Sequence, residues 1–287
     1  MDVVRRYYAA LKPERTYANV MTTAAGFLFA CKWHVDWSLC FATIVGTTLI
    51  VMSACAANNC TDHNLDTRMP RTKKRPTATG DVSVRNLAIL AGVLGVAGFV
   101  ILALWVNWLT LLLGAIAYAD YVLLYAWTKR TTPWSTLAGT VSGAVPLVAG
   151  YTAVTDHFGI VAAALGLVMV FWQMPHFYAI SIFRLKDYKA GGLPVWPARY
   201  GVKNTQVWML VYTALYLLAV ILLVATGSTN VAFAVILGLM GLYWLWLGVK
   251  GFRSEKPDKW ARGMFGFSLI TLLVLSAGIA SASVLPR

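Results

Sequence analysis

Three oxygen-bearing side chains, Asn58, Asp62 and Asp66, follow one another at four-residue intervals. If this stretch is helical, a rotation of roughly 100° per residue places them within about 80° of one another on one face. Apolar residues precede them from position 38 onward, so the three side chains would project from the end of a membrane helix. Carboxylate and amide oxygens suit Mg²⁺, which commonly completes its coordination shell with substrate phosphates. The spacing therefore predicts a magnesium site that holds a diphosphate.

A basic loop begins directly after these three residues. Six lysines and arginines occur from Arg68 to Arg85. Because arginines and metal ions both stabilise phosphate oxygens, this loop beside two carboxylates indicates a diphosphate site. We interpret the cluster at 68–75 mainly as phosphate-binding, and the clusters at 129–130 and 250–262 mainly as determinants of membrane topology.

A second set of polar residues lies in the apolar stretch 158–183 and just beyond it. On one continuous helix, Gln173, His176, Ile180, Arg184 and Asp187 would fall within about 80° of one another. Ionisable groups inside a membrane are costly and are functional candidates by default. His176 either bonds to a neighbouring helix or belongs to a site, and its polar companions favour a site. Asp187 would lie at the interface beside the metal, with His176 roughly 16 Å deeper.

Asp120 is a further acid within an apolar stretch, and no lysine or arginine lies within two helical turns of it. It is either neutral and hydrogen-bonded to a tyrosine or directed into a cavity. The four cysteines do not form a metal-binding pattern. Cys31 and Cys40 flank one loop and could pair, but free thiols are favoured.

Composition assigns these residues to a membrane protein. The chain has 287 residues, of which 59% are hydrophobic and 12% charged, with a mean hydropathy of +0.66; a soluble domain is nearer 25% charged. We predict an all-α polytopic membrane protein with a single transmembrane domain over 1–287. Nine stretches are long enough to span a bilayer as helices: 16–32, 38–58, 84–105, 108–127, 134–154, 158–183, 206–227, 229–249 and 264–284.

The formal net charge of +13 follows this topology. With nine spans, every lysine and arginine except Lys32 and Arg287 falls on one side of the membrane. This positive-inside pattern predicts a cytoplasmic amino terminus and an outside carboxyl terminus. The charge therefore does not indicate nucleic-acid binding. No signal-peptide cleavage pattern precedes the first span, which favours a prokaryotic inner membrane.

Ordered motifs over most of the chain resemble the UbiA superfamily of intramembrane prenyltransferases, and within it the haem O synthase (protohaem IX farnesyltransferase) branch. The motifs are Leu11-Lys12-Pro13, Asn58-Asn59-x-x-Asp62-x-x-x-Asp66, Arg71-Thr72-x-x-Arg75-Pro76, Tyr125-x-x-x-Lys129-Arg130, Gly143-Ala144-Val145-Pro146, Trp172-Gln173-Met174-Pro175-His176-Phe177, Phe183-Arg184-x-x-Asp187-Tyr188 and Leu193-Pro194-Val195. Asn64 departs from the pattern, since the haem branch commonly has another Asp there. In many superfamily members the second motif has more carboxylates than Arg184-Leu185-Lys186-Asp187. Asp187 therefore has fewer neighbouring carboxylates with which to hold a metal.

The resemblance implies nine helices around a central cavity that opens to the lipid bilayer. It also implies farnesyl transfer from farnesyl diphosphate to a vinyl group of haem b, with haem A synthase or a terminal oxidase as candidate partners. Asp62, Asp66 and His176 would be catalytic, and Mg²⁺ would be held by Asn58, Asp62, Asp66 and Asp187. Substrate would be bound by Arg68, Arg71, Lys74, Arg75, Lys129, Arg130, Gln173, Arg184 and Lys186. The alternatives are a prenyltransferase acting on a quinone or chlorophyll precursor and, less favoured because the polar groups crowd one face, a transporter.

Overall fold

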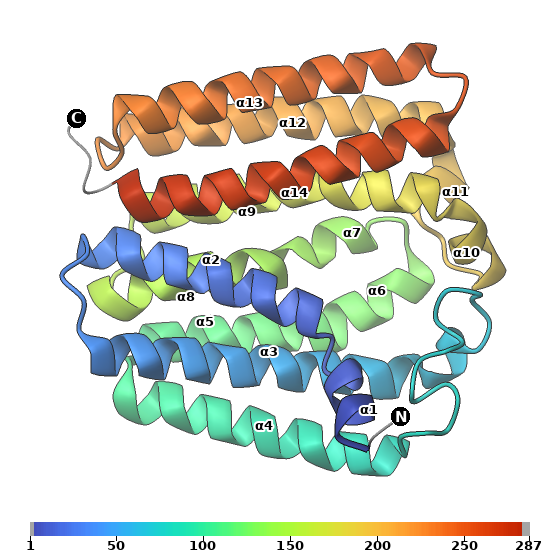
Figure 1. The fold of residues 1–287 in the computed structure, drawn as a ribbon, viewed down its shortest axis with the longest axis horizontal. Helices are drawn as coiled ribbons and strands as arrows, with labels where there is room; N and C mark the ends of the chain where they lie inside the picture. The colour runs from blue at the N-terminus through green and yellow to red at the C-terminus, as the bar shows by residue number, and fades with distance from the viewer. Residues whose placement is uncertain (1–2, 283–287) are drawn as a thin grey trace.

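A computed structural model describes residues 3–282, and every regular element in this range is a helix. Helix α3 illustrates why. Asp36 caps its amino end by accepting hydrogen bonds from the backbone of Ser38 and Leu39, and 30 residues follow without a proline. The long elements (Figure 1) are α2 (Pro13–Cys31), α3 (Trp37–Asp66), α4 (Val84–Trp105), α5 (Trp108–Ala119), α8 (Thr140–Thr155), α9 (Ile160–Phe183), α12 (Val202–Ala225), α13 (Val231–Lys250) and α14 (Pro257–Ala282).

Shorter elements extend some of these helices. A π-helical segment, η1 (Asp120–Tyr125), joins α5 to α6 (Ala126–Thr131), and α7 (Ser135–Ala138) leads into α8. Counted with these extensions, eight helices of the described range 3–282 are long and apolar enough to cross a membrane. Helix α2 is the ninth long helix of the bundle, but Glu14, Arg15 and Asn19 in its first turns lower its hydropathy. The nine-helix prediction is therefore confirmed approximately. The predicted end of the last span, at 284, lies outside the described residues.

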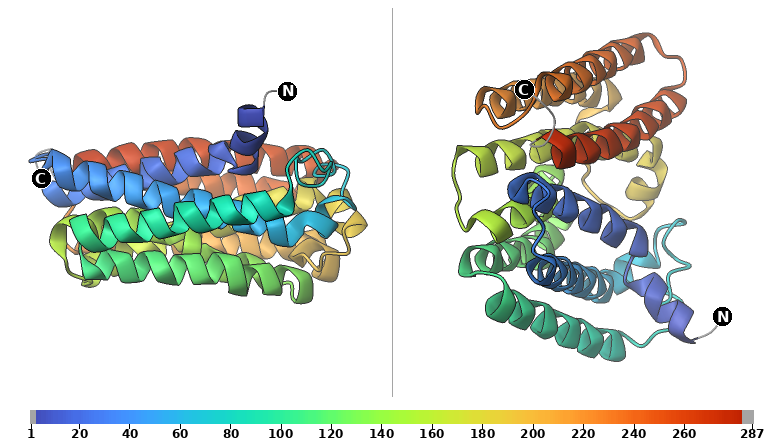
Figure 2. Two further views of the ribbon diagram at one scale, coloured as in Figure 1. Left: turned by 90° about the horizontal axis from the view of Figure 1, so that it is seen from below. Right: turned by 60° about the vertical axis from the view of Figure 1, so that its left-hand side comes forward.

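The helices form an inner group with others packed around it. Helix α2 contacts α3, α8 and α14, and α9 contacts α8, α12 and α14. Helix α4 lies against α3, and α13 lies against α12 and α14 (Figure 2). The inner helices α2, α3, α8, α9 and α14 thus surround the middle of the molecule, where polar side chains can be kept away from lipid.

Glycines allow α2 and α8 to approach closely. A Cβ atom on Gly26 would lie 2.0 Å from the carbonyl oxygen of Leu147, and one on Gly150 would lie 2.0 Å from that of Thr23. Such distances leave no room for a methyl group, so small residues set the spacing of these helices.

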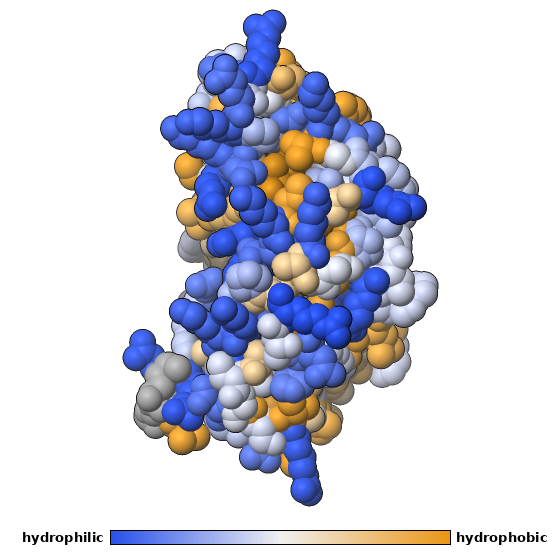
Figure 3. Space-filling view, turned by 90° about the vertical axis from the view of Figure 1, so that its right-hand side faces the viewer, coloured by the Kyte–Doolittle hydropathy of each residue, from blue (hydrophilic) through white to orange (hydrophobic). Residues whose placement is uncertain are grey.

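The long loops gather at one end of the bundle. Residues 67–83, α10 (Leu185–Ala190) and α11 (Trp196–Tyr200) lie at the right-hand end in Figure 1, near α1 (Val3–Ala10), whereas α2 carries Lys32 to the opposite end. Figure 3 shows hydrophilic residues over the loop-rich end, around a patch of hydrophobic ones. This end carries the predicted site.

Candidate active site

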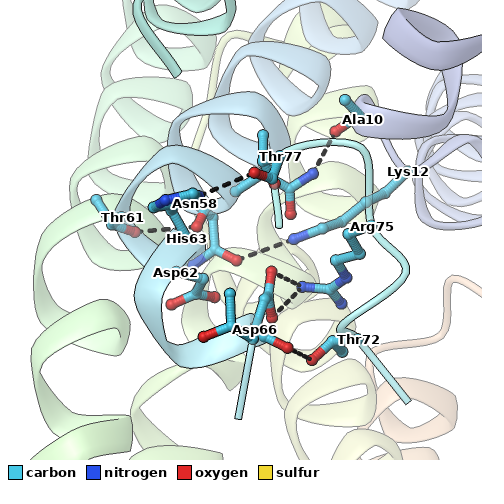
Figure 4. Close-up of polar contacts among 12 residues, drawn as sticks. Ala10, Lys12, Asn58, Thr61, Asp62, His63, Asp66, Thr72, Arg75 and Thr77 are labelled. Atoms are coloured by element: carbon cyan, nitrogen blue, oxygen red, sulfur yellow. Dashed lines mark hydrogen bonds and ion pairs between the residues drawn. The ribbon is translucent and has the colours of Figure 1, made fainter. Parts of the chain in front are cut away.

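The three side chains at the end of α3 lie together, as their spacing predicted. Helix α3 continues unbroken to Asp66, eight residues beyond the predicted span. Asn58, Asp62 and Asp66 are 3%, 5% and 0% exposed. Asp66 meets the loop 67–83 and Asn58 meets the segment before α2 (Figure 4), whereas Asp62 meets the end of α6. Buried carboxylates must be neutralised, so their partners determine the chemistry of this region.

Asp66 is neutralised by the basic loop. Arg75 Nη1 lies 2.9 and 2.8 Å from the two carboxylate oxygens. The Thr72 hydroxyl also donates to the backbone oxygen of Asp66 at 3.0 Å, which folds the loop back over the helix end (Figure 4). The cluster at 68–75 therefore reaches the carboxylates.

Asp62 is neutralised by the end of α6. Lys129 Nζ bonds to Oδ2, and Arg130 Nη2 donates to Oδ1 at 2.9 Å. Arg130 Nη2 also donates to the Thr61 carbonyl at 2.7 Å. Lys129 and Arg130 therefore contact a predicted metal ligand, in addition to the topology role predicted for them. The sequence could not reveal this contact, because 67 residues separate Asp62 from Lys129.

Asn58 contacts a third cation. Lys12 Nζ donates to the amide oxygen at 2.9 Å, while the Asn58 amide nitrogen has no hydrogen-bond partner among residues 3–282 (Figure 4). Lys12 adopts a left-handed backbone conformation, with φ +53°, just before α2. Burial, followed by the positive charge of Arg15, lowers the pKa of Lys12 to about 7. The sequence marks Lys12 only as part of a motif. The structure shows its contact with Asn58, a predicted metal ligand.

This donor set fits a magnesium ion. It offers one amide oxygen and two carboxylates on one helix face, with a cation hydrogen-bonded to each of them. Mg²⁺ is commonly held by one or two carboxylates with water and substrate phosphates in the remaining positions. Asn58, Asp62 and Asp66 are therefore the residues that would hold it.

The polar residues of α9 do not form one continuous row. Helix α9 ends at Phe183, and Arg184 has φ −107° and ψ 15° before α10 begins at Leu185. The prediction of a single helix to Asp187, and the depth calculated from it, is wrong beyond Phe183. Asp187 Oδ2 instead lies 3.7 Å from Arg184 Nη1. Within residues 3–282 it does not join Asp62 and Asp66 in a three-acid cluster.

The remaining basic candidates lie on the surface of the same end. The two long loops touch, since a Cβ on Gly191 would lie 2.8 Å from Met69 Cγ. Arg71 is exposed, with Arg75, Arg184 and Tyr188 among its electrostatic neighbours. The other three candidates are exposed and make no hydrogen bond or ion pair within the described chain: Arg68, Lys74 and Lys186.

A cavity of about 390 Å³ lies between the inner helices. Its apolar wall comes from α3, α9 and α14, for example Ile50, Met169 and Leu272, and Gln173 and His176 also line it from α9. The carboxylates of Asp62 and Asp66 do not line it. The site thus has two parts. One is a cap formed by Asn58, Asp62, Asp66 and the cations bound to them. The other is a largely apolar cavity whose polar lining includes Glu14, Arg15, Gln173 and His176.

His176 is held in a defined orientation. Its Nδ1 lies 2.7 Å from the Ser268 hydroxyl, and its ring stacks on Trp172 with centroids 4.9 Å apart. Ser268 donates its own proton to the Phe265 carbonyl at 2.5 Å, so its oxygen accepts from Nδ1–H. This network assigns the tautomer and leaves Nε2 with a free lone pair. His176 thus combines the two alternatives raised by the sequence: it bonds to a neighbouring helix, α14, and it lies on the cavity wall.

Gln173 is fixed by backbone contacts. Its amide nitrogen donates to the carbonyls of Thr140 and Met169, each at 3.1 Å. Its oxygen occupies the space over Gly143, where a Cβ would lie only 2.0 Å away. A glycine on α8 therefore makes room for this side chain.

Asp120 follows neither expectation. Its Oδ2 accepts a hydrogen bond from the backbone nitrogen of Ser142 at 3.1 Å, and Oδ1 has no hydrogen-bond partner in the described part of the chain. It does not bond to a tyrosine, and it is not among the cavity-lining residues. The four cysteines are free, as expected.

Comparison with known proteins identifies the family. Residues 19–270 match the UbiA prenyltransferase family. The chain belongs to this family. With its eight apolar helices, it is a multi-pass membrane protein.

Relatives in this family carry a specific name. The chain is 41% identical over 279 residues to "Protoheme IX farnesyltransferase 1" of Shewanella frigidimarina (strain NCIMB 400), covering 96% of this chain and 92% of that protein. It is 40% identical over 274 residues to "Protoheme IX farnesyltransferase 2" of Pseudomonas putida (strain GB-1), covering 95% and 93%.

Solved UbiA structures share the fold. A UbiA homolog from Archaeoglobus fulgidus bound to GPP and Mg²⁺ matches with a TM-score of 0.74 at 13% identity, covering 96% of this chain and 99% of that one. A UbiA homolog from Aeropyrum pernix K1 matches with a TM-score of 0.76 at 21% identity, covering 93% and 97%.

Two residues of this UbiA site escaped the sequence-based prediction. Ser268 orients His176 from a helix 92 residues away, and serine in a membrane helix gives no distinct signal. Arg15 lies on the cavity wall, although its position at the start of α2 suggested only an interfacial charge. Both contacts depend on how the helices pack.

Proposed function

We propose that this enzyme transfers a farnesyl group from farnesyl diphosphate to a vinyl group of haem b, giving haem O. The observation that carries the proposal is the separation of the cap from the cavity wall on which His176 lies with its Nε2 free. A prenyl diphosphate needs cations and metal, and a haem needs a large apolar cavity with a nitrogen ligand. The names of the relatives support the same reaction.

The cap binds the diphosphate of the donor. Asn58, Asp62 and Asp66 would hold Mg²⁺, and Asp187 is the further ligand proposed from α10. A bound Mg²⁺ supplies positive charge to the departing diphosphate. Arg75, Lys129 and Arg130 then turn from the carboxylates to the phosphate oxygens, where charge grows as the bond breaks. The exposed residues Arg68, Arg71, Lys74 and Lys186 complete the cationic surface.

The cavity binds the acceptor and excludes water. Breaking the bond between the farnesyl C1 and its oxygen sends the electron pair to the diphosphate. The vinyl π electrons then form the new carbon–carbon bond, and water adds to the resulting cation and loses a proton. Apolar walls keep water from quenching the allylic cation early. His176 Nε2 would contact the haem iron, and Gln173 would support the acceptor beside it. Arg184, which lies beside Asp187 outside the cavity lining, would add to the cationic surface of the cap.

The enzyme would act as one membrane domain in a prokaryotic inner membrane, with its basic end in the cytoplasm. That orientation gives the cap access to soluble farnesyl diphosphate. The product is hydrophobic and stays in the bilayer, where haem A synthase or a haem-copper oxidase would receive it.

Product analysis tests the proposal. Purified enzyme is given farnesyl diphosphate, Mg²⁺ and an equal mixture of haem b and a quinone precursor, and products are read by mass spectrometry. Hydroxyethylfarnesyl haem should form, and a chelator should abolish it. A prenylated quinone precursor without prenylated haem would instead support the alternative acceptor.

A further inference from the structure

Arg15 differs from the other cations of the site in its position. It is the single lysine or arginine among residues 3–282 that lines the cavity. Its Nη1 donates to the Tyr121 hydroxyl at 2.6 Å. It makes no ion pair with any carboxylate of the described chain. By contrast, the cations of the cap are engaged with Asp62 and Asp66 and lie outside the cavity lining.

The tyrosine that accepts the hydrogen bond from Arg15 belongs to a stacked aromatic pair. The rings of Tyr121 and Tyr125 stack with centroids 5.5 Å apart and an interplanar angle of 13°. Both belong to η1, and π-helical turns often occur at functional sites because they re-aim side chains. The guanidinium has five N–H donors, and the tyrosine occupies one edge. Donors therefore remain for a ligand in the cavity.

The position of Arg15 favours an anionic group on the acceptor. Arg15 shares the cavity with Gln173 and His176 and is an electrostatic neighbour of His176. Haem carries two propionate carboxylates, and guanidinium binds carboxylates in a planar, two-point geometry. We propose that Arg15 binds a haem propionate and so sets which edge of the haem faces the cap. This inference rests on the proposed function.

The test compares haem b with its dimethyl ester, in which both propionates are esterified. Affinities are measured by absorbance titration for the wild-type enzyme, Arg15→Gln and the matched control Arg5→Gln, an exposed arginine on α1. A hydrogen bond to a charged group corresponds to about 10- to 100-fold in affinity. The wild type and Arg5→Gln should bind the diester weaker than haem by about this factor. Arg15→Gln should bind haem weaker by the same factor and no longer distinguish the two.

Binding of labelled farnesyl diphosphate to the same proteins supplies the second arm. Unchanged affinity in Arg15→Gln would show that the variant is folded and support the proposal. Continued discrimination between haem and its diester by Arg15→Gln would overturn it. Loss of diphosphate affinity with unchanged haem affinity would also overturn it, because Arg15 would then belong to the cap, while the proposed function would stand. A wild-type enzyme that binds neither haem b nor its dimethyl ester would contradict the proposed function and the inference together.

Discussion

Each oxygen ligand at the end of α3 has a cation beside it: Lys12 at Asn58, Lys129 and Arg130 at Asp62, and Arg75 at Asp66. Removing one member of a buried ion pair leaves the other charge uncompensated, which is more costly than the pair is worth. Substitutions here therefore affect both stability and substrate binding. Their interpretation needs a binding measurement beside the activity.

Arg75→Gln should weaken farnesyl diphosphate binding by about 1–3 kcal/mol, because it removes a charged hydrogen-bond donor that faces both Asp66 and the phosphate. Direct binding of labelled farnesyl diphosphate in Mg²⁺ measures this loss. Arg199→Gln is the control, since Arg199 is exposed on α11 and makes no ion pair within the described residues. Equal affinities for the two variants would exclude Arg75 from the diphosphate site.

Ser268→Ala should weaken haem binding by about 10- to 100-fold, the usual effect of removing the group that orients a ligating histidine. Without the hydroxyl, the Nδ1 proton of His176 loses its acceptor and the tautomer is no longer fixed. Haem titration by absorbance measures the affinity and the iron spectrum. Ser276→Ala, a buried serine on the same helix, should retain both. An unchanged spectrum in Ser268→Ala would reduce the Ser268 contact to packing.

At the scale of elements, the spacing of residues along one helix correctly predicted which side chains share a face. The four-residue spacing of Asn58, Asp62 and Asp66 is a property of one helix, and α3 has that geometry throughout. The same reasoning failed at Arg184, because a break between α9 and α10 has no strong residue signal. Contacts across helices, such as Ser268 with His176, depend on packing between residues far apart in sequence. The family motifs marked those positions without showing their partners.

Gly150→Ala should destabilise the protein by about 1–3 kcal/mol, the typical cost of overpacking. Its Cβ would lie 2.0 Å from the Thr23 carbonyl oxygen, so α2 and α8 must separate. Thermal unfolding in detergent measures the change. Gly238→Ala on α13 is the control, because no atom lies within 4 Å of its added Cβ. If both variants unfold at the same temperature, the α2–α8 contact is looser than described.

At the scale of the whole molecule, the basic clusters and the two long loops share one end, and Lys32 lies at the other. A positively charged end retained in the cytoplasm would account for both topology and substrate access. The same residues would then serve two purposes, so net charge alone would not indicate the function.

Cysteine labelling tests this orientation. In a variant without native cysteines, Ser228→Cys at the α12–α13 turn should react with a membrane-impermeant maleimide in intact spheroplasts. Ser254→Cys, between α13 and α14, should react only after the membrane is opened. The reverse pattern would place the cap outside the cell and away from cytoplasmic farnesyl diphosphate.

The division between cap and cavity is tested most directly by one crossed binding measurement. Wild-type enzyme, Asp62→Asn and His176→Ala are each titrated with labelled farnesyl diphosphate in Mg²⁺ and with haem b. Asp62→Asn should lose affinity for farnesyl diphosphate and keep haem affinity, because Asp62 belongs to the cap. His176→Ala should do the reverse, because His176 lines the cavity. If either variant loses both ligands equally while remaining folded, or if His176→Ala keeps full haem affinity, the two-part site is contradicted.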